Sequence, residues 1–320
     1  MSIRWSYAIN QWKPNIDDFV RRRDHERALK TISISGFEAV ELNVASFGPW
    51  EPLGNPFQIA NNFGTAAGFR GFLRDCALTG ASSWFYDPGF GFVEDRSTGF
   101  DVRDPEQLPG LLEKAAWLAG ALVELGGDRL VVRAAPPAWQ GGALDEAQLR
   151  HVAAAWNAVG ARTAGLGVRT TLHLDFLSAL RLDDGLERLI DATDPAHVGV
   201  TADTAELAAS GIDPVDFVRR HAARIDHVHL KDAREVCPLD EIAIPVADLQ
   251  VRAGGGPRGV ERWFFELGRG GLVDAEAVVR ALVAADYDGW VVVESDQSPH
   301  PAESAMLNGW TVQKVLAPLC

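Results

Sequence analysis

Short apolar runs alternate with longer amphipathic stretches along the whole chain. Eight of the apolar runs have the length of buried strands. They are Ile3–Ile9, Ala39–Asn43, Ser82–Tyr86, Arg129–Arg133, Val168–His173, Val198–Asp203, Ile225–Leu230 and Trp290–Glu294. The stretches with a helical period include Ile16–Ile34, Gly68–Leu78, Gln107–Leu125, Leu144–Ala164, Val215–Ala223 and Ala275–Ala284. Strands and helices that alternate in this number predict an α/β fold, a (β/α)8 TIM barrel.

The predicted strands differ in how clearly the sequence marks them. Arg129–Arg133 and Trp290–Glu294 contain continuous valines, which is typical of strands that are buried on both faces. Ser82–Tyr86 is the weakest of the eight, because the segment SSWFY is equally compatible with a loop.

Two long connections leave the predicted barrel, one after the second strand (Ala45–Gly64) and one after the seventh (Ala233–Gly271). Both leave from the C-terminal ends of strands, the face on which barrel enzymes keep their active sites. Their aromatic residues are compatible with covering a substrate and equally with plain packing. These residues are Phe47, Trp50, Phe57, Trp263 and Phe264. No Pro-, Gly- or Ser-rich linker divides the chain, so we expect residues 1–320 to form a single domain.

Composition narrows the class of protein. Among 320 residues, 30 Lys and Arg face 44 Asp and Glu, and the net charge of −14 disfavours nucleic acid or an anionic membrane as partner. The sequence contains no apolar run of about 18 residues, and the polar residues in MSIRWSYAINQW are unlike a signal peptide. The three cysteines are far apart and form no CxxC pair. We therefore expect a cytoplasmic protein with neither a disulfide framework nor a cysteine zinc site.

Side chains alternate between the two faces of a strand, which predicts what lines the barrel interior. In RIDHVHLKD this alternation places His227, His229 and Lys231 on one face. Three polar side chains on a buried face are costly unless they have partners. His229 lies at the end of the strand, whereas His227 is compatible with a core role or with support of His229.

The last four predicted strands each end in a potential metal ligand. These residues are His173, Asp203, His229 and Glu294. Consecutive strands would place them in one sector of the barrel rim. Two imidazoles with two carboxylates suit Mn²⁺, Zn²⁺, Fe²⁺ or Co²⁺ better than Ca²⁺. A single histidine at a strand end is more often a core residue, so it is the combination that predicts a metal site.

Several segments resemble a known family. HVHLKD, FELGRGGLVD and YDGWVVVESD resemble the second half of the xylose-isomerase-like TIM barrels, which include sugar phosphate isomerases, epimerases and inosose dehydratases. VGVTADTAELAASGIDP resembles their sixth strand and the turn after it, and AINQW and GFEAVELN resemble their first two strands. The resemblance is strong over residues 167–317 and looser before them.

The resemblance implies metal-ligand roles for individual residues. The family's carboxylate on the sixth strand corresponds to Asp203, its histidine on the seventh to His229, and its glutamate on the eighth to Glu294. On the fifth strand His173 stands where most members have a glutamate, and Asp175 is the alternative fourth ligand. The implied cofactor is a divalent metal ion, with Mn²⁺ favoured and Zn²⁺, Co²⁺ or Fe²⁺ as alternatives.

Within the family, LHLDFLSALR and the aromatic loop after the second strand resemble the larger subunit of bacterial C-glycoside deglycosidases. Those enzymes cleave the carbon–carbon bond between an oxidised sugar and an aromatic aglycone, and they work with a small β-rich partner subunit. The resemblance therefore implies a carbohydrate lyase that acts on a 3-keto-C-glycoside, as a homo- or hetero-oligomer. A sugar phosphate isomerase or epimerase, or an inosose dehydratase, is the alternative.

The step common to these enzymes is removal of a proton α to a carbonyl, with a divalent cation stabilising the enolate. The base must lie within hydrogen-bond reach of the C–H group. The candidates are Lys231, Glu206, Asp175, and His173 if it is not a ligand. Glu206 stands where many relatives have the histidine of Asp-Thr-Gly-His, so it takes over a polar role or that role is lost. For Lys231, a salt bridge with Asp232 or a rim carboxylate is an equally good interpretation.

Three other functions fit a barrel of this kind less well. Epimerases of the family commonly use glutamates on the fifth and eighth strands, and His173 replaces the first of them. A nuclease on this fold needs more metal ligands and a basic surface, which the charge of −14 opposes. A non-catalytic binding barrel would have no use for the ligand set.

Overall fold

The computed structural model describes the chain except for residues 1–2, 13–19, 45–52, 90–98, 245–262 and 297. Eight parallel strands form a closed barrel. They are β1 (Arg4–Ala8), β2 (Ala39–Val44), β3 (Ala81–Tyr86), β4 (Arg129–Arg133), β5 (Arg169–His173), β6 (Val198–Asp203), β7 (Ile225–Leu230) and β10 (Trp290–Val293). The order around the barrel follows the sequence, and β10 closes it against β1. The predicted TIM barrel is therefore confirmed.

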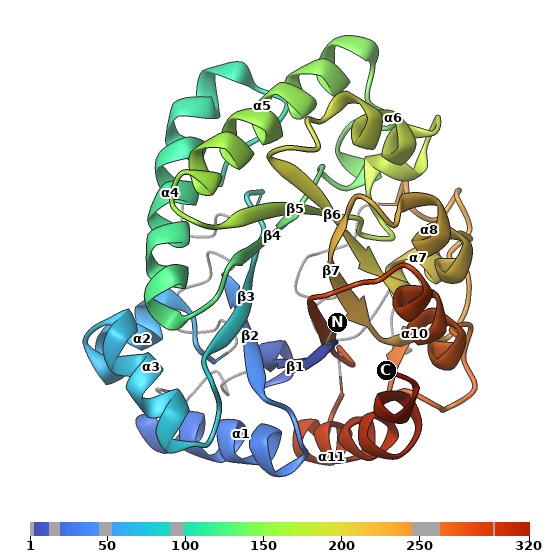
Figure 1. Ribbon diagram of the computed structural model, residues 1–320. Helices are drawn as coiled ribbons and strands as arrows, with labels where there is room; N and C mark the ends of the chain where they lie inside the picture. Colours follow the sequence, from blue (N-terminus) through green and yellow to red (C-terminus); the bar gives the residue numbers. More distant parts are fainter. Residues whose placement is uncertain (1–2, 13–19, 45–52, 90–98, 245–262, 297) are drawn as a thin grey trace.

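Helices surround the barrel, as Figure 1 shows. They are α1 (Arg22–Ile34), α2 (Pro56–Phe63), α3 (Ala66–Asp75), α4 (Leu108–Leu125), α5 (Glu146–Ala164), α6 (Gly185–Ala192), α7 (Thr204–Ala209), α8 (Pro214–His221), α10 (Ala275–Ala284) and α11 (Pro301–Thr311). The short 3-10 turns include η3 (Pro105–Gln107). Within the described part of the chain, no helix has the length and apolar character needed to cross a membrane.

The differences from the predicted elements have local causes. The third strand, marked weakly by the sequence, pairs with both neighbours because its serines find partners inside the barrel: the Ser83 hydroxyl donates to Glu41. Helix α3 begins two residues earlier than predicted, since the hydroxyl of Thr65 caps it by accepting the N–H of Gly68. Helix α1 begins only at Arg22, after an extended Arg21.

The two long connections contain structure of their own. The first includes α2, and the second includes a short antiparallel pair, β8 (Asp232–Ala233) and β9 (Phe264–Phe265). Trp263 and Phe264 are buried and pack against Phe176, and the ring of Phe264 also lies 4.2 Å from Nζ of Lys231. Phe57 is 52% exposed, and Phe47 and Trp50 lie outside the described residues.

Candidate metal centre

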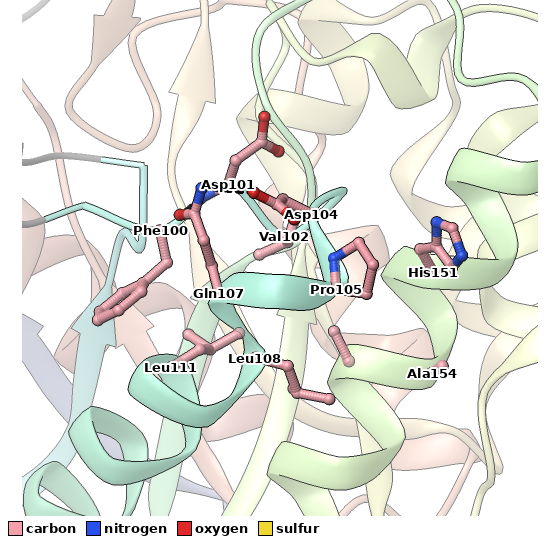
Figure 2. Close-up of a pocket in the computed structure, with 11 residues that line it drawn as sticks. Phe100, Asp101, Val102, Asp104, Pro105, Gln107, Leu108, Leu111, His151 and Ala154 are labelled. Carbon is pink, nitrogen blue, oxygen red and sulfur yellow. Dashed lines mark hydrogen bonds between the residues drawn. The ribbon is translucent and has the colours of Figure 1, made fainter.

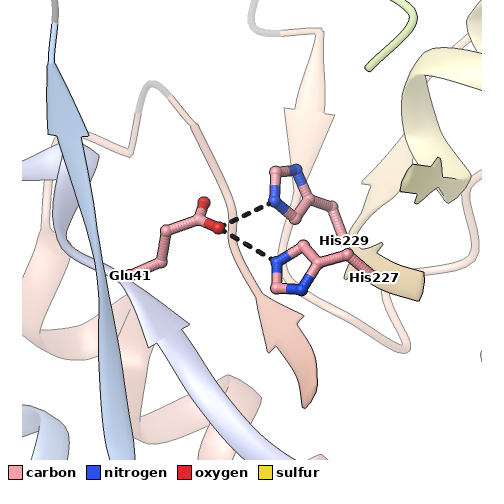
Figure 3. A group of neighbouring side chains, drawn as sticks. All are labelled: Glu41, His227 and His229. Atoms are coloured by element: carbon pink, nitrogen blue, oxygen red, sulfur yellow. Dashed lines mark hydrogen bonds and ion pairs between the residues drawn. The ribbon is translucent and has the colours of Figure 1, made fainter. Parts of the chain in front are cut away.

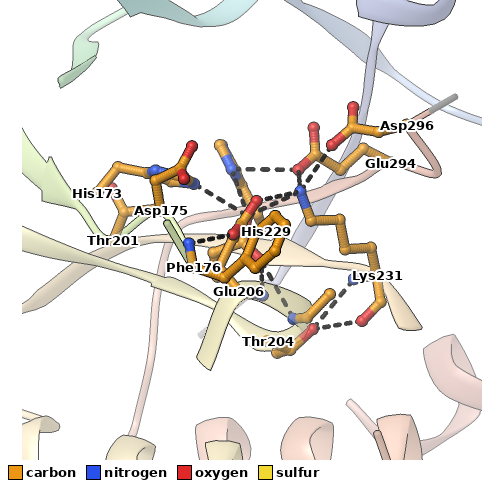
Figure 4. A network of polar contacts seen from close by, with 12 residues as sticks. His173, Asp175, Phe176, Thr201, Thr204, Glu206, His229, Lys231, Glu294 and Asp296 are labelled. Atoms are coloured by element: carbon orange, nitrogen blue, oxygen red, sulfur yellow. Dashed lines mark hydrogen bonds and ion pairs between the residues drawn. The ribbon is translucent and has the colours of Figure 1, made fainter. Parts of the chain in front are cut away.

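The four neighbouring strands β5, β6, β7 and β10 bring the predicted ligands into one sector of the barrel rim (Figure 4). His173 ends β5, Asp203 ends β6, His229 is the penultimate residue of β7, and Glu294 directly follows β10. Each of the four is at most 4% exposed. Parallel pairing sets Asp203 directly beside His229, so the strand register determines that these two residues are neighbours.

The donor atoms of these residues are spaced like ligands of one cation. His173 Nε2 lies 3.0 Å from Asp203 Oδ2, and the same oxygen lies 3.3 Å from His229 Nδ1. His229 Nδ1 lies 3.5 Å from Glu294 Oε1. Ligands held about 2.1 Å from a common metal ion are themselves roughly 3.0–3.4 Å apart. His173, Asp203 and His229 have donor atoms that all lie within 4.8 Å of one another and could hold a metal ion, and Glu294 adjoins this group through His229.

The carboxylate of Asp203 is held by the helix that begins after it. Its Oδ1 atom accepts the backbone N–H groups of Ala205 and Glu206, which are the orphan donors at the start of α7. Its Oδ2 atom is left to face His173 and His229. The cap therefore orients the carboxylate toward the cluster.

Asp175, the alternative ligand, is directed elsewhere. Its Oδ2 atom forms an ion pair with Arg133 at the end of β4, at 2.8 Å, and its Oδ1 atom accepts the N–H of Leu177. On β5 the structure thus brings His173, and not Asp175, into the cluster.

Lys231 is the most unusual residue of the site, because its ammonium is 1% exposed among carboxylates. Its Nζ atom lies near Glu294 Oε1 (2.6 Å), Asp296 Oδ2 (2.8 Å), Asp203 Oδ2 (3.2 Å) and Glu206 Oε1 (3.4 Å). The salt bridge predicted for Lys231 is therefore with these carboxylates. Asp232 lies away from it and accepts the backbone N–H groups of Gly271 and Val273.

Burial and neighbouring charges shift the pKa values of Lys231, Asp203 and Glu294 in different directions. Burial opposes the charge of Lys231, but the surrounding carboxylates raise its pKa well above the usual range. Burial likewise opposes the charge of Asp203, but Lys231, His173 and His229 hold its pKa well below the usual range. Burial, reinforced by Asp296, raises the pKa of Glu294 to about 8. These carboxylates are thus held by an ammonium and by protons, and a divalent cation at the same place would displace such protons and supply the positive charge instead.

Glu206 lies beside the cluster on the first turn of α7. Its Oε2 atom accepts the N–H of Phe176 at 2.7 Å, and its Oε1 atom lies 3.4 Å from Lys231 Nζ. Burial, together with the charges of Asp175 and Asp203, raises the pKa of its carboxyl group well above the usual range. Glu206 thus holds a proton at a pH where Asp203 is ionised.

Sequence reasoning missed residues that reach the site from just after β1 and from β2. Asn10 donates from its amide nitrogen to Glu294 Oε2 at 3.0 Å and also contacts Asp296. Glu41 of β2 contacts both His227 and His229. The glutamate in the apolar strand GFEAVELN was the one available signal, since an ionisable residue inside a buried strand needs a partner.

The described part of the structure includes a larger and a smaller cavity. One, of about 200 Å³, opens beside Arg133 and is also lined by Asp87, Phe100, Pro136 and Gln140. Arg133, which lines this cavity, forms an ion pair with Asp175. The other, of about 60 Å³, lies between η3, α4 and α5 and is lined by none of the cluster residues (Figure 2).

Comparison with known proteins places the chain in a family. The sequence pattern of the xylose isomerase-like TIM barrels matches residues 32–310, and the chain belongs to this family. An inosose dehydratase from Geobacillus thermodenitrificans is 33% identical over 153 residues, which cover 47% of this chain and 49% of that protein. The chain thus spans about half the length of the curated relatives it matches.

Solved structures support the same fold at lower sequence identity. An L-ribulose 3-epimerase superposes with a TM-score of 0.69 and 15% identity, over 99% of this chain and 96% of that one. The IOLI protein, whose crystal structure holds a zinc atom, superposes with a TM-score of 0.70 and 11% identity, over 99% of both chains. These similarities establish the barrel. The resemblance to C-glycoside deglycosidases has no counterpart in the names of these relatives, which are those of a dehydratase and an epimerase.

Proposed function

We propose that the protein is a divalent-metal-dependent lyase that enolises a ketone of the sugar or inosose type and eliminates its β-hydroxyl as water. The observation that carries this proposal is the convergence of His173 Nε2, Asp203 Oδ2, His229 Nδ1 and Glu294 Oε1 beside the ammonium of Lys231. The matches to inosose dehydratases support a dehydration, and they favour it over deglycosidation.

The four neighbouring residues would hold the cation, which would displace the proton of Glu294 on binding. When bound, a divalent metal supplies Lewis-acid chemistry at the carbonyl oxygen of the substrate. The mixed nitrogen and oxygen donors favour Mn²⁺, Zn²⁺, Co²⁺ or Fe²⁺. Mn²⁺ remains our first choice for the test.

Lys231 acts in this scheme as a fixed positive charge and not as the base. Its pKa is raised well above the usual range, so the amine keeps its proton at neutral pH. An ammonium that is already held in place by carboxylates stabilises developing negative charge on a substrate oxygen without reorganising.

The remaining candidates divide into an acid and a base. Asp175, ion-paired with Arg133 at the rim, takes the proton from the carbon next to the carbonyl. The electron pair of that C–H bond forms the enolate, with the negative charge on the carbonyl oxygen. When this charge returns to re-form the carbonyl, the enolate pair forms the double bond between the α- and β-carbons and the β-carbon–oxygen bond breaks. Glu206, protonated through burial, gives its proton to the departing hydroxyl, which leaves as water. Glu206 contacts the N–H of Phe176, the residue after Asp175, so both groups lie in the same part of the rim.

A C-glycoside lyase, working with a small β-rich subunit, is the second candidate. The observation that favours it is the cavity of about 200 Å³ beside Arg133, whose lining includes Phe100, Pro136 and Pro137. A ring and two prolines next to the site offer apolar surface for an aromatic aglycone. In this reaction Glu206 would protonate the departing aromatic carbon in place of a hydroxyl.

One experiment separates these candidates. Purified protein with Mn²⁺ is incubated with an inosose and, separately, with a 3-keto-C-glycoside, and the products are separated by chromatography. Loss of water from the inosose supports the dehydratase, and release of free aglycone supports the C-glycoside lyase. The matched control is Asp175→Asn, which keeps the shape of the side chain but removes the base. Epimerised substrate without elimination would overturn the lyase proposal in favour of an isomerase or epimerase.

A further inference from the structure

Glu41 is a buried carboxylate that the proposed reaction does not use. It lies in β2, and its side chain extends across the barrel interior toward His227 and His229 of β7 (Figure 3). Its Oε2 atom contacts the Oγ atom of Ser83 at 2.6 Å and the Nε2 atoms of both histidines at 3.1 Å. Its ion-pair partners among the described residues are these two rings.

The contacts determine which nitrogen of His229 carries a proton. A carboxylate oxygen only accepts hydrogen bonds, so Nε2 of the ring must donate its N–H to Glu41. A neutral imidazole with its proton on Nε2 has a bare lone pair on Nδ1. In His229 that lone pair faces Asp203 Oδ2 at 3.3 Å and Glu294 Oε1 at 3.5 Å. Beside these two oxygens Nδ1 needs a positive partner, which is a second proton in the metal-free protein and a divalent cation in the metal-loaded one.

We propose that Glu41 is a positioning residue for the metal centre: by accepting the Nε2–H of His229, it holds the ring in the tautomer that offers Nδ1 to a divalent cation. Carboxylates that act through a metal-bound histidine in this way also fix the ring orientation and raise the basicity of the ligating nitrogen. The inference rests on the metal binding of the proposed function.

Glu41 is itself held in place by its neighbours. The pairing of β2 with β3 shifts register between Val40 and Glu41, and the shift sets Glu41 opposite Ser83. A local irregularity of this kind re-aims a side chain. The Ser83 hydroxyl and the ring of His227 then donate to the same oxygen that His229 uses. Three donors on one oxygen leave the carboxylate little freedom to turn away from His229.

The first test reads the tautomer directly and needs no variant. Protein labelled with ¹⁵N in its histidines is loaded with Zn²⁺, and the ring nitrogens of His229 are observed by NMR. We expect the nitrogen shifts to show Nδ1 bound to zinc and Nε2 protonated, with a slowly exchanging proton. The signals are assigned by comparison with His227→Gln. Zinc bound through Nε2 would overturn the proposal, whereas a role of Glu41 in core stability alone would not select either nitrogen.

The second test measures metal affinity by competition with a chelator. Glu41→Gln replaces the charged acceptor by a neutral amide, which accepts the Nε2–H of His229 less strongly and no longer raises the basicity of Nδ1 by its charge, so we expect Zn²⁺ to bind about 10–100-fold more weakly. The matched control is Ser83→Ala, which removes one hydrogen bond from the same oxygen and leaves the carboxylate in place. We expect Ser83→Ala to bind Zn²⁺ within a few-fold of the wild type.

The outcomes separate this inference from the proposed function. If the wild type and Glu41→Gln bind Zn²⁺ equally well, the role of Glu41 is refuted and the metal centre stands. If the wild type binds none of the four candidate metals, the proposed function fails and this inference fails with it. If Glu41→Gln does not fold, the NMR measurement on the wild type still decides which nitrogen faces the metal.

Discussion

The two halves of the barrel rim carry different chemistry. Along β5, β6, β7 and β10 the strand ends present imidazole, carboxylate and ammonium groups that contact one another. Along β1 to β4 the strands end in Ala8, Val44, Tyr86 and Arg133. Only the last of these is charged, and its ion pairs with Asp87 and Asp175 lie beside the larger cavity. In the proposed function, the first half would hold the cation and the second would leave room for the rest of the substrate.

The half formed by β1 to β4 nevertheless contributes to the site from inside the barrel. Glu41 reaches His229 from β2, and Asn10, just after β1, reaches Glu294. Both residues contact groups of the first half by hydrogen bonds that those groups need in order to keep their orientation. We therefore propose that the half formed by β5, β6, β7 and β10 (the binding half) binds the metal, and that residues of the half formed by β1 to β4 orient its ligands.

The largest effect should come from the residue at the centre of the binding half. In Asp203→Asn the side-chain oxygen still caps α7, but an amide NH₂ replaces the Oδ2 atom that faces His173 and His229. An NH₂ group has no lone pair for a metal, so we expect loss of stoichiometric metal and at least ~10³-fold lower turnover. Metal analysis of the purified variant, together with the elimination assay, measures both.

The chain offers a matched control for the capping role. Asp213 caps α8 through the N–H groups of Val215 and Asp216, as Asp203 caps α7, but it lies on the surface. Asp213→Asn should keep its metal and its activity. Full metal occupancy in Asp203→Asn would contradict the assignment of the binding half.

The second effect concerns Lys231, which contacts the same carboxylate oxygens that would bind the metal. Lys231→Met keeps much of the side-chain volume and removes the positive charge. We expect kcat to fall about 10²–10³-fold, because one fixed donor to a developing oxyanion is lost. Metal affinity should stay the same or increase, since a competing cation is removed. Enzyme kinetics and chelator competition on the same samples test the two effects separately.

The control for this variant is a lysine in a different environment. Lys30 is exposed and pairs with Glu26 one turn earlier in α1. Lys30→Met should leave kcat and metal affinity unchanged. A Lys231→Met protein that turns over at the wild-type rate would show that the ammonium only balances charge.

The sequence predicted the barrel and the strand ends but not the contacts that cross the interior. Strand alternation placed His227, His229 and Lys231 on the inner face, and the structure buries all three. Glu41 was not identified, because its contact with His229 joins residues 188 positions apart and depends on the barrel closing. For Lys231 the sequence suggested a salt bridge with Asp232 or a rim carboxylate, but not the four carboxylates that surround it, since three strand ends must converge before they meet.

The smallest expected effect is a dependence of the stability of the metal-free protein on pH. Glu294 has a pKa of about 8 in the folded protein, compared with a usual value of 4.5. Between these pH values the folded protein keeps a proton that the unfolded chain has released, so the free energy of unfolding falls as pH rises. His229 acts in the same direction above pH 6.5: Glu41, Glu294 and Asp203 overcome the effect of burial and raise its pKa well above that usual value.

The histidines with lowered pKa do not cancel this trend. Burial lowers the pKa of His173 and His227 below 6.5, so their effect on stability is confined to lower pH, where the unfolded chain takes up protons. We therefore expect the Tm of metal-free protein to fall by a few degrees from pH 6.5 to 8. Each proton that only the folded protein retains lowers the free energy of unfolding by roughly 1 kcal/mol per pH unit as the pH rises. With saturating Mn²⁺ the fall should be smaller, because the cation displaces these protons. Glu294→Gln, which cannot ionise, should show a flatter profile without metal. A metal-free Tm that rises over this interval would show that the buried carboxylates of the binding half are balanced by charges within the protein.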